Sequence, residues 1–355
     1  MTRSVLICSA ARLTSDGRFA NVGDEALTQC LAEGVRRRFP GVAARATLNV
    51  RQSPAYAVPP GRVPVRPVRR LARQILAADV VMIGGGTLVQ EEVEPRPFEP
   101  VAGLLRYLTT VTILASAFRK PTVIVAIGAE ELQYGRSRAA ARFICRRAAA
   151  VSARDAASAT VLRNLADRDV AVVGDPLFLS GDAIQAQPPA TPPRRVAVSL
   201  RPDAPRELVR AVAEAIDDAE DVQLVAMDRE RAGDVVALER LRAAVDRPAR
   251  CRLLSLNTDW RAVVAELAQA DLCIGMRLHF LIFAALAGRP SVALTSSPKT
   301  VSFAAEVGLA AAAIDAPAAN VASAVARATP AQPSAVEALR GRAWRALDPL
   351  EAWLA

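Results

Sequence analysis

The chain has 355 residues, 52% of them apolar and 4% aromatic, and carries a formal net charge of +9. This length and apolar content exclude a disordered chain and are typical of about two globular domains, each with its own core. A single histidine and five scattered cysteines without CxxC spacing exclude a zinc-finger-like centre, so the sequence predicts no metal site.

The positive charge comes almost entirely from arginine, because 43 of the 45 basic residues are arginine and only Lys120 and Lys299 are lysine. The arginines are spread along the whole chain, and aromatic residues that can stack on bases are few. We therefore expect no nucleic-acid partner, while attraction to anionic ligands or to an anionic membrane surface stays open.

The sequence suggests neither a signal peptide nor a membrane-spanning segment. The N-terminus begins directly with an apolar run typical of a first β-strand. The most membrane-like stretch, Val101–Phe118, contains Arg106 and several polar side chains, which favours a buried helix. We expect a cytoplasmic protein with at most a peripheral contact at the inner membrane face.

In the first half of the chain, short β-branched runs alternate with longer helical ones. The expected strands are Val5–Cys8, Ala46–Val50, Val80–Ile83, Thr122–Ile127, Ala149–Ser152 and Val170–Val173. The expected helices are Glu25–Phe39, Arg69–Ala77, Gly103–Phe118, Arg136–Arg147 and Asp155–Ala166. Continuously apolar strands that alternate with helices indicate a parallel sheet covered on both faces.

A segment rich in proline and small residues, Ser180–Arg195, has no apolar periodicity and is typical of a linker. The alternation then restarts, with expected strands at Val196–Leu200, Val222–Ala226, Arg252–Leu254, Leu272–Ile274 and Ser291–Leu294. The helices between them are expected at Arg206–Ala219, Asp234–Val245, Trp260–Ala270 and His279–Ala287.

These patterns predict an α/β fold with two similar domains that face a ligand cleft. The expected parts are an N-terminal domain over residues 1–180, a linker over 181–194, a C-terminal domain over 195–330, and a helical segment over 331–355 that packs at the domain junction. In open parallel sheets ligands bind beyond the carboxyl ends of the strands, so the residues that follow each strand are the candidates for function.

Two strand ends in the first half carry glycine-containing loops. Asn21, Gly23, Asp24 and Glu25 follow the first strand, where Gly23 permits close backbone approach and Asp24 is a candidate helix N-cap. The loop Gly84–Thr87 follows a wholly apolar strand and can expose backbone N–H groups to a phosphate or carboxylate. A plain turn explains either loop as well, and neither matches a nucleotide-binding fingerprint.

Charged residues stand at further strand ends. Arg154 and Arg201 each follow an apolar strand and can hold an anion, although such residues are more often part of a cap or turn. Arg277 and His279 follow the strand at Leu272–Ile274 and open an apolar helix that needs neither of them. Arginine grips carboxylates and phosphates bidentately, and histidine suits proton transfer near neutral pH.

The next strand ends in Thr295-Ser296-Ser297-Pro298-Lys299. A basic residue at a helix start opposes the helix dipole, so Lys299 favours a functional reason for its place.

In order along nearly the whole chain, several motifs resemble those of the polysaccharide pyruvyl transferase family, most closely its bacterial branch that acts on cell-wall glycans. The motifs are Asn21–Leu27, Gly84–Gln90, Ser152–Asp155, Gly174–Pro176, Ser199–Pro202 and Gly275–Lys299. The resemblance implies a glycosyltransferase-B-like (GT-B-like) fold of two facing Rossmann-type domains. It also implies transfer of a pyruvyl group from phosphoenolpyruvate to two hydroxyls of one sugar, which makes a cyclic ketal and releases phosphate.

On this hypothesis His279 is the principal acid–base residue and Arg277 clamps the donor carboxylate or phosphate. Asp24 or Glu25 activates the sugar hydroxyl or orients the acceptor. The expected substrate contacts are Lys299, Arg201, Gly84, Gly85, Gly86, Thr87, Asn21, Gly23, Glu25, Arg154 and Ser297. Phosphoenolpyruvate is the donor substrate, no cofactor is expected, and the acceptor is a glycan that is either free or lipid-linked.

Two other readings stay open. Close relatives have Tyr-Asp-Pro where this chain has Ser296-Ser297-Pro298, which motivates a degenerate relative that binds ligand without turnover. A sugar-nucleotide glycosyltransferase of the same architecture would instead hold a diphosphate with Arg277 and Lys299.

Overall fold

The computed structural model describes residues 2–14, 19–47, 65–91, 101, 103–180, 189–229 and 233–355. Its chain divides into two compact units: unit 1 comprises Met1–Phe19, Asp24–Ser180 and Leu339–Ala355, and unit 2 comprises Ala20–Gly23 and Gly181–Ala338. Residues 181–188 of the predicted linker and residues 48–50 of the predicted strand Ala46–Val50 lie outside the described residues.

Unit 1 is built on one seven-stranded sheet. Its strands are β1 (Ser4–Cys8), β2 (Ala43–Thr47), β3 (Val80–Gly84), β4 (Thr87–Val89), β5 (Thr122–Ala129), β6 (Ala150–Ala153) and β7 (Ala171–Val172). Its helical elements are α1 (Val22–Arg38), α2 (Val65–Leu76), α3 (Gly103–Ala117), α4 (Gly135–Arg147), α5 (Ala156–Ala166), η2 (Pro176–Leu179), α12 (Pro333–Arg345), η4 (Asp348–Leu350) and α13 (Glu351–Leu354), of which α1 and α12 begin in unit 2.

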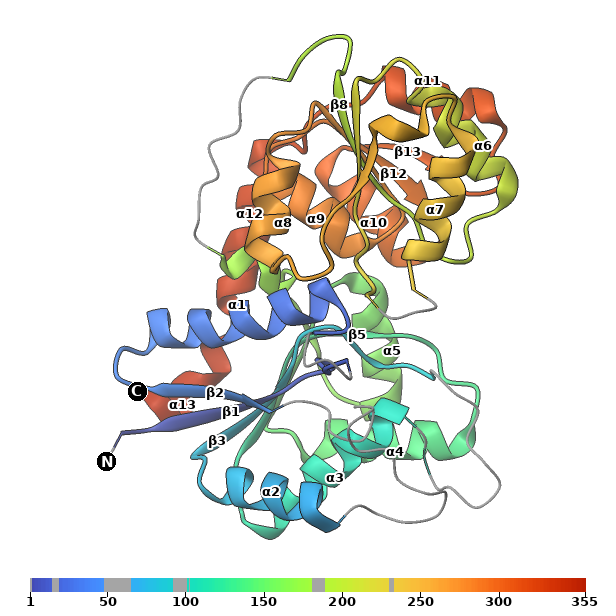
Figure 1. Ribbon diagram of the computed structural model, residues 1–355. Helices are drawn as coiled ribbons and strands as arrows, with labels where there is room; N and C mark the ends of the chain where they lie inside the picture. Colours follow the sequence, from blue (N-terminus) through green and yellow to red (C-terminus); the bar gives the residue numbers. More distant parts are fainter. Residues whose placement is uncertain are drawn as a thin grey trace. The chain divides into compact units, whose positions relative to one another are not determined.

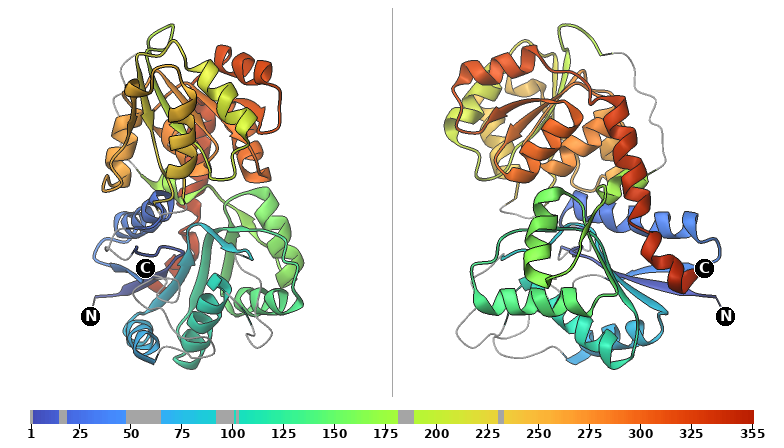
Figure 2. Two further views of the ribbon diagram at one scale, coloured as in Figure 1. Left: turned by 45° about the vertical axis from the view of Figure 1, so that its right-hand side comes forward. Right: turned by 180° about the vertical axis from the view of Figure 1, so that it is seen from behind.

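The unit 1 strands are parallel in the order β2-β1-β3-β5-β6-β7, and β4 pairs with β5 beside this path. Helices α2, α3, α4 and α5 pack side by side as one layer (Figure 1). On α1, a Cβ at Gly34 would come within 2.9 Å of Leu179 and 3.3 Å of Leu347, so this helix packs closely on η2 and on the C-terminal segment. The sheet is thus covered on both faces (Figure 2).

Unit 2 is a six-stranded parallel sheet between two helical layers. Its strands are β8 (Arg195–Ser199), β9 (Asp221–Leu224), β10 (Cys251–Leu253), β11 (Leu272–Gly275), β12 (Ser291–Thr295) and β13 (Ala310–Ala313). Its helices are α6 (Arg206–Ala215), α7 (Val235–Ala244), η3 (Pro248–Arg250), α8 (Trp260–Leu267), α9 (Leu278–Leu286), α10 (Pro298–Val307) and α11 (Ala318–Ala326).

The strand order in unit 2 is β10-β9-β8-β11-β12-β13, which is the order of a Rossmann fold, with its reversal between β8 and β11. Helices α7, α6 and α11 form one layer, and α8, α9 and α10 form the other (Figure 1). The predicted α/β class with two Rossmann-like domains is therefore confirmed.

Most predicted elements lie within a few residues of the observed ones, with local differences at their ends. Strand β2 begins at Ala43, three residues before the predicted start, and α6 ends at Ala215 instead of Ala219. The 3-10 turn η2, strand β4, strand β13 and helix α11 were not predicted.

All five cysteines are buried thiols. Burial raises the pKa of Cys8, Cys145 and Cys273 to about 12, so these thiols stay protonated and unreactive at neutral pH.

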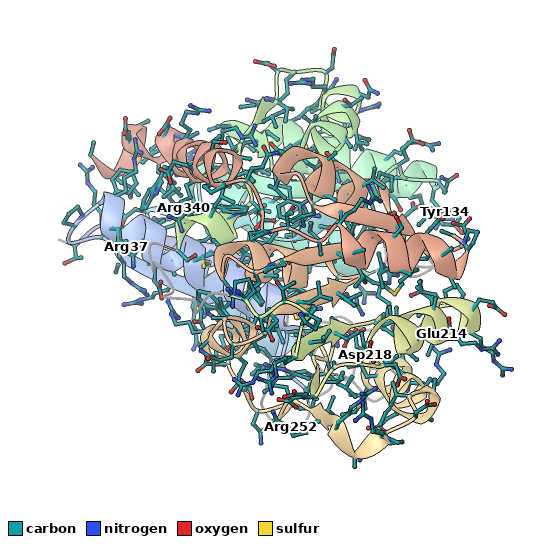
Figure 3. All side chains as sticks on the ribbon, turned by 90° about the horizontal axis from the view of Figure 1, so that it is seen from above. Arg37, Tyr134, Glu214, Asp218, Arg252 and Arg340 are labelled. Carbon is teal, nitrogen blue, oxygen red and sulfur yellow. The ribbon has the colours of Figure 1, made fainter. Side chains whose placement is uncertain are left out.

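Many surface arginines are paired locally. Arg252, which projects outward in Figure 3, lies 2.7 Å from Asp221, and Arg194 lies 2.7 Å from Glu220. Water and salt screen such exposed pairs, so they shape the surface charge more than they stabilise the fold. Among the described residues, no helix is both long and apolar enough to cross a membrane.

Candidate active site

The loops after β8 and β11 meet at the point where the strand order of unit 2 reverses. The backbone N–H of Met276 donates to the Ser199 carbonyl at 2.9 Å, and the backbone N–H of Arg201 lies 3.5 Å from the Met276 sulfur. Arg277 follows Met276 directly. Ligands of open α/β sheets bind beyond this point, so Arg201 and Arg277 occupy the expected place for substrate contacts.

His279 is the second residue of α9, whose interior residues Phe280–Ala285 are buried. The imidazole is partly exposed, and its Nε2 atom is buried. The turn before the helix is tight: a Cβ at Gly275 would lie 2.3 Å from the Phe280 ring, so only glycine fits there. The structure therefore places His279 at the end of β11, as the sequence predicts.

Arg277 is held by a buried carboxylate that the sequence did not reveal. Its Nε lies 3.1 Å from both oxygens of Asp234, and its Nη2 lies 2.5 Å from Asp234 Oδ1. The Asp234 side chain is 0% exposed, and it also accepts from the backbone N–H groups of Met227 at 3.1 Å and Asp228 at 3.0 Å. The Nε–Nη2 edge of the Arg277 guanidinium is thus occupied by hydrogen bonds to Asp234.

Burial and ion pairing shift the pKa values of Asp234 and Arg277 in opposite directions. Burial raises the pKa of Asp234, although the hydrogen bonds and charge of Arg277 act in the other direction. Burial lowers the pKa of Arg277, but the bonds to Asp234 and the nearby Asp228 outweigh it and raise that pKa. Within the described residues Nη1 of Arg277 makes no hydrogen bond, so its N–H groups are available to an anion.

Asp234 precedes α7 and resembles an ordinary helix cap in the sequence. In the structure it stands at the N-cap position with helical backbone angles, and its side chain makes no capping hydrogen bond. The carboxylate serves Arg277 instead, 43 residues away in the chain. A buried acidic side chain that does not cap its own helix is a signal that only the folded structure provides.

The segment Ala20–Gly23 belongs to unit 2 and lies against His279. Asn21 Oδ1 accepts from the backbone N–H of Gly23 at 2.8 Å, as an N-cap side chain does. Because α1 begins at Val22, the prediction that Asp24 is the N-cap is wrong: Asp24 lies in the first turn, and Asn21 caps the helix.

Lys299 is the second residue of α10 and is partly exposed. Ser297 is the N-cap of this helix and forms a capping box with Thr300. The backbone N–H of Ser297 donates to Thr300 Oγ1 at 3.4 Å, and the two hydroxyl oxygens lie 3.3 Å apart. The Ser297 hydroxyl therefore has a structural use, and its predicted contact with substrate stays a prediction. Arg201 likewise forms a two-pronged pair with Asp203, at 3.0 and 3.1 Å.

In unit 1 the glycine loop follows β3, beside β1, where the order of that sheet reverses. Gly85 and Gly86 have φ angles of +77° and +89°, which side-chain-bearing residues rarely adopt. A Cβ at Gly86 would stand 3.4 Å from the Asp24 carboxylate. The loop thus requires its glycines, and Glu25 nearby is buried.

Arg154 is a buried bridge between strand ends of unit 1, with its side chain 4% exposed. Its Nη2 donates to Thr87 Oγ1 at 2.9 Å, and it pairs with Asp155 at 3.3 Å and with Asp175 at 3.7 Å. Burial raises the pKa of Asp175, against the lowering effect of Arg154. Two carboxylates already balance this arginine, so its contact with a substrate anion stays a prediction.

Gly174, in the Gly174–Pro176 motif, is expected to be needed for packing. In Gly174→Ala the new Cβ would lie 2.4 Å from the Leu339 carbonyl oxygen and 3.0 Å from the Ala343 backbone nitrogen, and backbone atoms cannot swing aside. We expect a loss of about 1–3 kcal/mol in the free energy of unfolding, measured with urea. The control is Gly341→Ala in α12, the helix that carries Leu339 and Ala343, because a Cβ at Gly341 meets nothing within 4 Å. Equal free energies of unfolding for the two variants would contradict the expectation.

No three His, Cys, Asp or Glu side chains in the described part of the chain gather as a metal site would require.

Chains with two Rossmann-like domains also occur among solved structures that resemble this one. A putative UDP-N-acetylglucosamine 2-epimerase from Listeria monocytogenes aligns with a TM-score of 0.61 at 11% identity, over 99% of this chain and 95% of the epimerase. Anabaena Alr3699/HepE in complex with UDP-glucose aligns with a TM-score of 0.58 at 14% identity, over 97% and 94% of the two chains. The fold is therefore of the GT-B type.

The family model of polysaccharide pyruvyl transferases matches residues 21–298. The chain belongs to this family, and it is a transferase, as its motifs predict. No curated protein sequence matches it significantly.

Proposed function

We propose that this protein transfers the pyruvyl group of phosphoenolpyruvate onto two hydroxyls of a glycan sugar, which forms a cyclic ketal and releases phosphate. The observation that carries the proposal is the pair Arg277 and His279 at the strand-order reversal of unit 2, in a chain of the polysaccharide pyruvyl transferase family. A cation and a proton-transfer group stand there two residues apart.

The chemistry needs both groups. A proton adds to the methylene carbon of phosphoenolpyruvate, which becomes the methyl group, and the adjacent carbon becomes oxocarbenium-like. Two sugar hydroxyls form C–O bonds to that carbon and lose their protons, while the bond to phosphate breaks. Of the two protons lost, one balances the methyl group and the other leaves with hydrogen phosphate. Positioned acid–base groups and fixed positive charge lower the barrier for such steps.

In this proposal His279 moves the protons, and Nη1 of Arg277 holds an oxygen of the donor carboxylate or phosphate. Lys299 and Arg201 supply further positive charge to the anionic donor. The backbone N–H groups of the Gly84–Gly86 loop are further candidate contacts for the anionic donor, and Asp24 or Glu25 activates or orients the acceptor. The acceptor is a glycan, either free or carried on a lipid at the inner membrane face.

The test is an assay of the purified protein with phosphoenolpyruvate and a panel of glycan acceptors, with phosphate release and product mass as readouts. We expect phosphate release that depends on the acceptor, and a product with the mass of a pyruvyl ketal. Phosphoenolpyruvate should also raise the Tm, because a ligand that binds only the folded state stabilises it.

The competing function is sugar-nucleotide glycosyl transfer, since the Anabaena neighbour is a complex with UDP-glucose. A rise in Tm with UDP-glucose and none with phosphoenolpyruvate would overturn the proposal. Binding of phosphoenolpyruvate with no product from any acceptor would point to a relative that binds without turnover.

A further inference from the structure

Gly23 touches the imidazole of His279 so closely that no side chain fits between them. A Cβ at Gly23 would lie 1.9 Å from Nδ1 of His279, 2.6 Å from Cγ and 2.9 Å from Cε1. Three ring atoms would thus be closer than real Cβ contacts allow. The backbone of Gly23 therefore forms a wall that limits where the ring can stand.

The wall is fixed to unit 2 by the loop that follows β9. The backbone N–H of Val22 donates to the Met227 carbonyl at 2.9 Å, and the backbone N–H of Arg229 donates to the Ala20 carbonyl at 2.8 Å. Asn21 and Asp228 form an antiparallel bridge between these bonds. Residues 20–23 thus pair with residues 227–229 like a short piece of sheet.

The same loop holds the partner of Arg277. Backbone N–H groups of Met227 and Asp228 donate to Asp234 Oδ2, and Asp234 receives Arg277 through Nε and Nη2. One support, residues 227–229, therefore connects through Gly23 to His279 and through Asp234 to Arg277.

We propose that Gly23 and Asp234 are positioning residues, which act through the 227–229 loop to set the imidazole of His279 and the guanidinium of Arg277 in register with each other. The importance of this register for catalysis depends on the proposed function, whereas the placement of the two side chains does not. Reacting groups must lie within a narrow range of distances and angles, and a misplacement of ~1 Å can cost ~100-fold in rate.

Gly23→Ala separates this role from a general role in folding. Alanine is a better helix former than glycine, and Gly23 lies within α1, so the substitution favours the helix locally. The three nearest atoms in the clash are all side-chain atoms of His279 and none is a backbone atom, so movement of the ring can relieve it. We therefore expect a folded protein whose His279 ring has moved.

Asp234→Asn tests the connection from the 227–229 loop through Asp234 to Arg277. The amide keeps the shape of the side chain but loses the charge, and it replaces one acceptor oxygen with a donor that faces the donors of Arg277. Among the described residues, Asp228 is then the carboxylate that still pairs with Arg277, at 3.8 Å. The guanidinium is expected to turn toward it.

The single histidine makes the experiment direct. Protein labelled with isotopic histidine gives only the ring signals of His279, which NMR follows without assignment. The variants are Gly23→Ala and Asp234→Asn. Their controls are Gly341→Ala, which has open space around its Cβ, and Asp217→Asn, which breaks the 2.9 Å pair with Arg250 elsewhere in unit 2.

We expect Gly23→Ala to shift the His279 ring signals and to lower kcat by ~100-fold with little change in the affinity for phosphoenolpyruvate. Asp234→Asn should instead raise the KM for phosphoenolpyruvate, and both controls should resemble the wild type. Ring signals in Gly23→Ala that match the wild type would overturn the proposal, as would an unchanged KM in Asp234→Asn. If wild-type protein transfers no pyruvyl group, the proposed function fails, and the ring signals alone decide the positioning of His279.

Discussion

His279→Gln is expected to lower kcat for pyruvyl transfer by about 10²–10⁴-fold, the range of general acid–base catalysis. Glutamine keeps a polar side chain near the same place but cannot exchange a proton near neutral pH. Because the proposed function assigns donor binding to positive charge and not to the imidazole, the affinity for phosphoenolpyruvate should change little. Single-turnover rates and the Kd for phosphoenolpyruvate measure the two effects separately.

The chain offers no second histidine that could take over the proton transfer. His279→Ala should therefore behave like His279→Gln, apart from any effect of the space it leaves. Near-normal transfer by either variant would show that the acid–base group lies elsewhere. A loss of donor binding equal to the loss of kcat would assign His279 to binding instead.

Arg277→Lys is expected to lower kcat/KM by about 10- to 100-fold, the effect of losing one hydrogen bond to a charged group. In the structure Arg277 uses Nε and Nη2 for Asp234, which leaves Nη1 for a substrate. A lysine ammonium is a single point charge and cannot serve the buried carboxylate and a donor anion from one position. Steady-state kinetics with varied phosphoenolpyruvate measures the loss, which should fall largely on KM.

Arg250→Lys is the matched control for that substitution. The side chain of Arg250 is 6% exposed, against 23% for Arg277, and it pairs with Asp217 in the same unit. If the two variants lose the same activity, the effect of Arg277→Lys comes from weakened folding and not from donor binding. Full activity of Arg277→Lys would contradict the proposed role of Arg277 in holding the donor anion.

Apolar strands and their alternation with helices carried most of the fold prediction. Strand β3 and strand β5 are buried along their whole length, as continuous β-branched runs predict. Strand β13 was missed because its sequence is four alanines, which favour helices in isolation. Its pairing with β12 is a tertiary effect that local preference does not contain.

The part of the candidate site that lies at the end of a predicted strand could be predicted from the sequence. Arg277 and His279 stand at a strand end, where a parallel sheet brings ligands, and the motif around them gave the family. Asp234 was not predictable, because nothing near it in the sequence indicates a bond to a residue 43 positions later. The contact of Gly23 with His279 joins still more distant segments, and only the folded chain reveals it.

The last residues of the chain belong to the unit that the first residues begin. Arg3, next to β1, donates to the Trp353 carbonyl, Arg38 pairs with Asp348 at 2.8 Å, and Gly174 lies against the backbone of Leu339. A ribosome makes the N-terminal part first, and domains tend to fold as they emerge. The surfaces of unit 1 that Leu339–Ala355 covers therefore stay exposed until all of unit 2 has been synthesised. Unit 1 begins to fold first and is completed last.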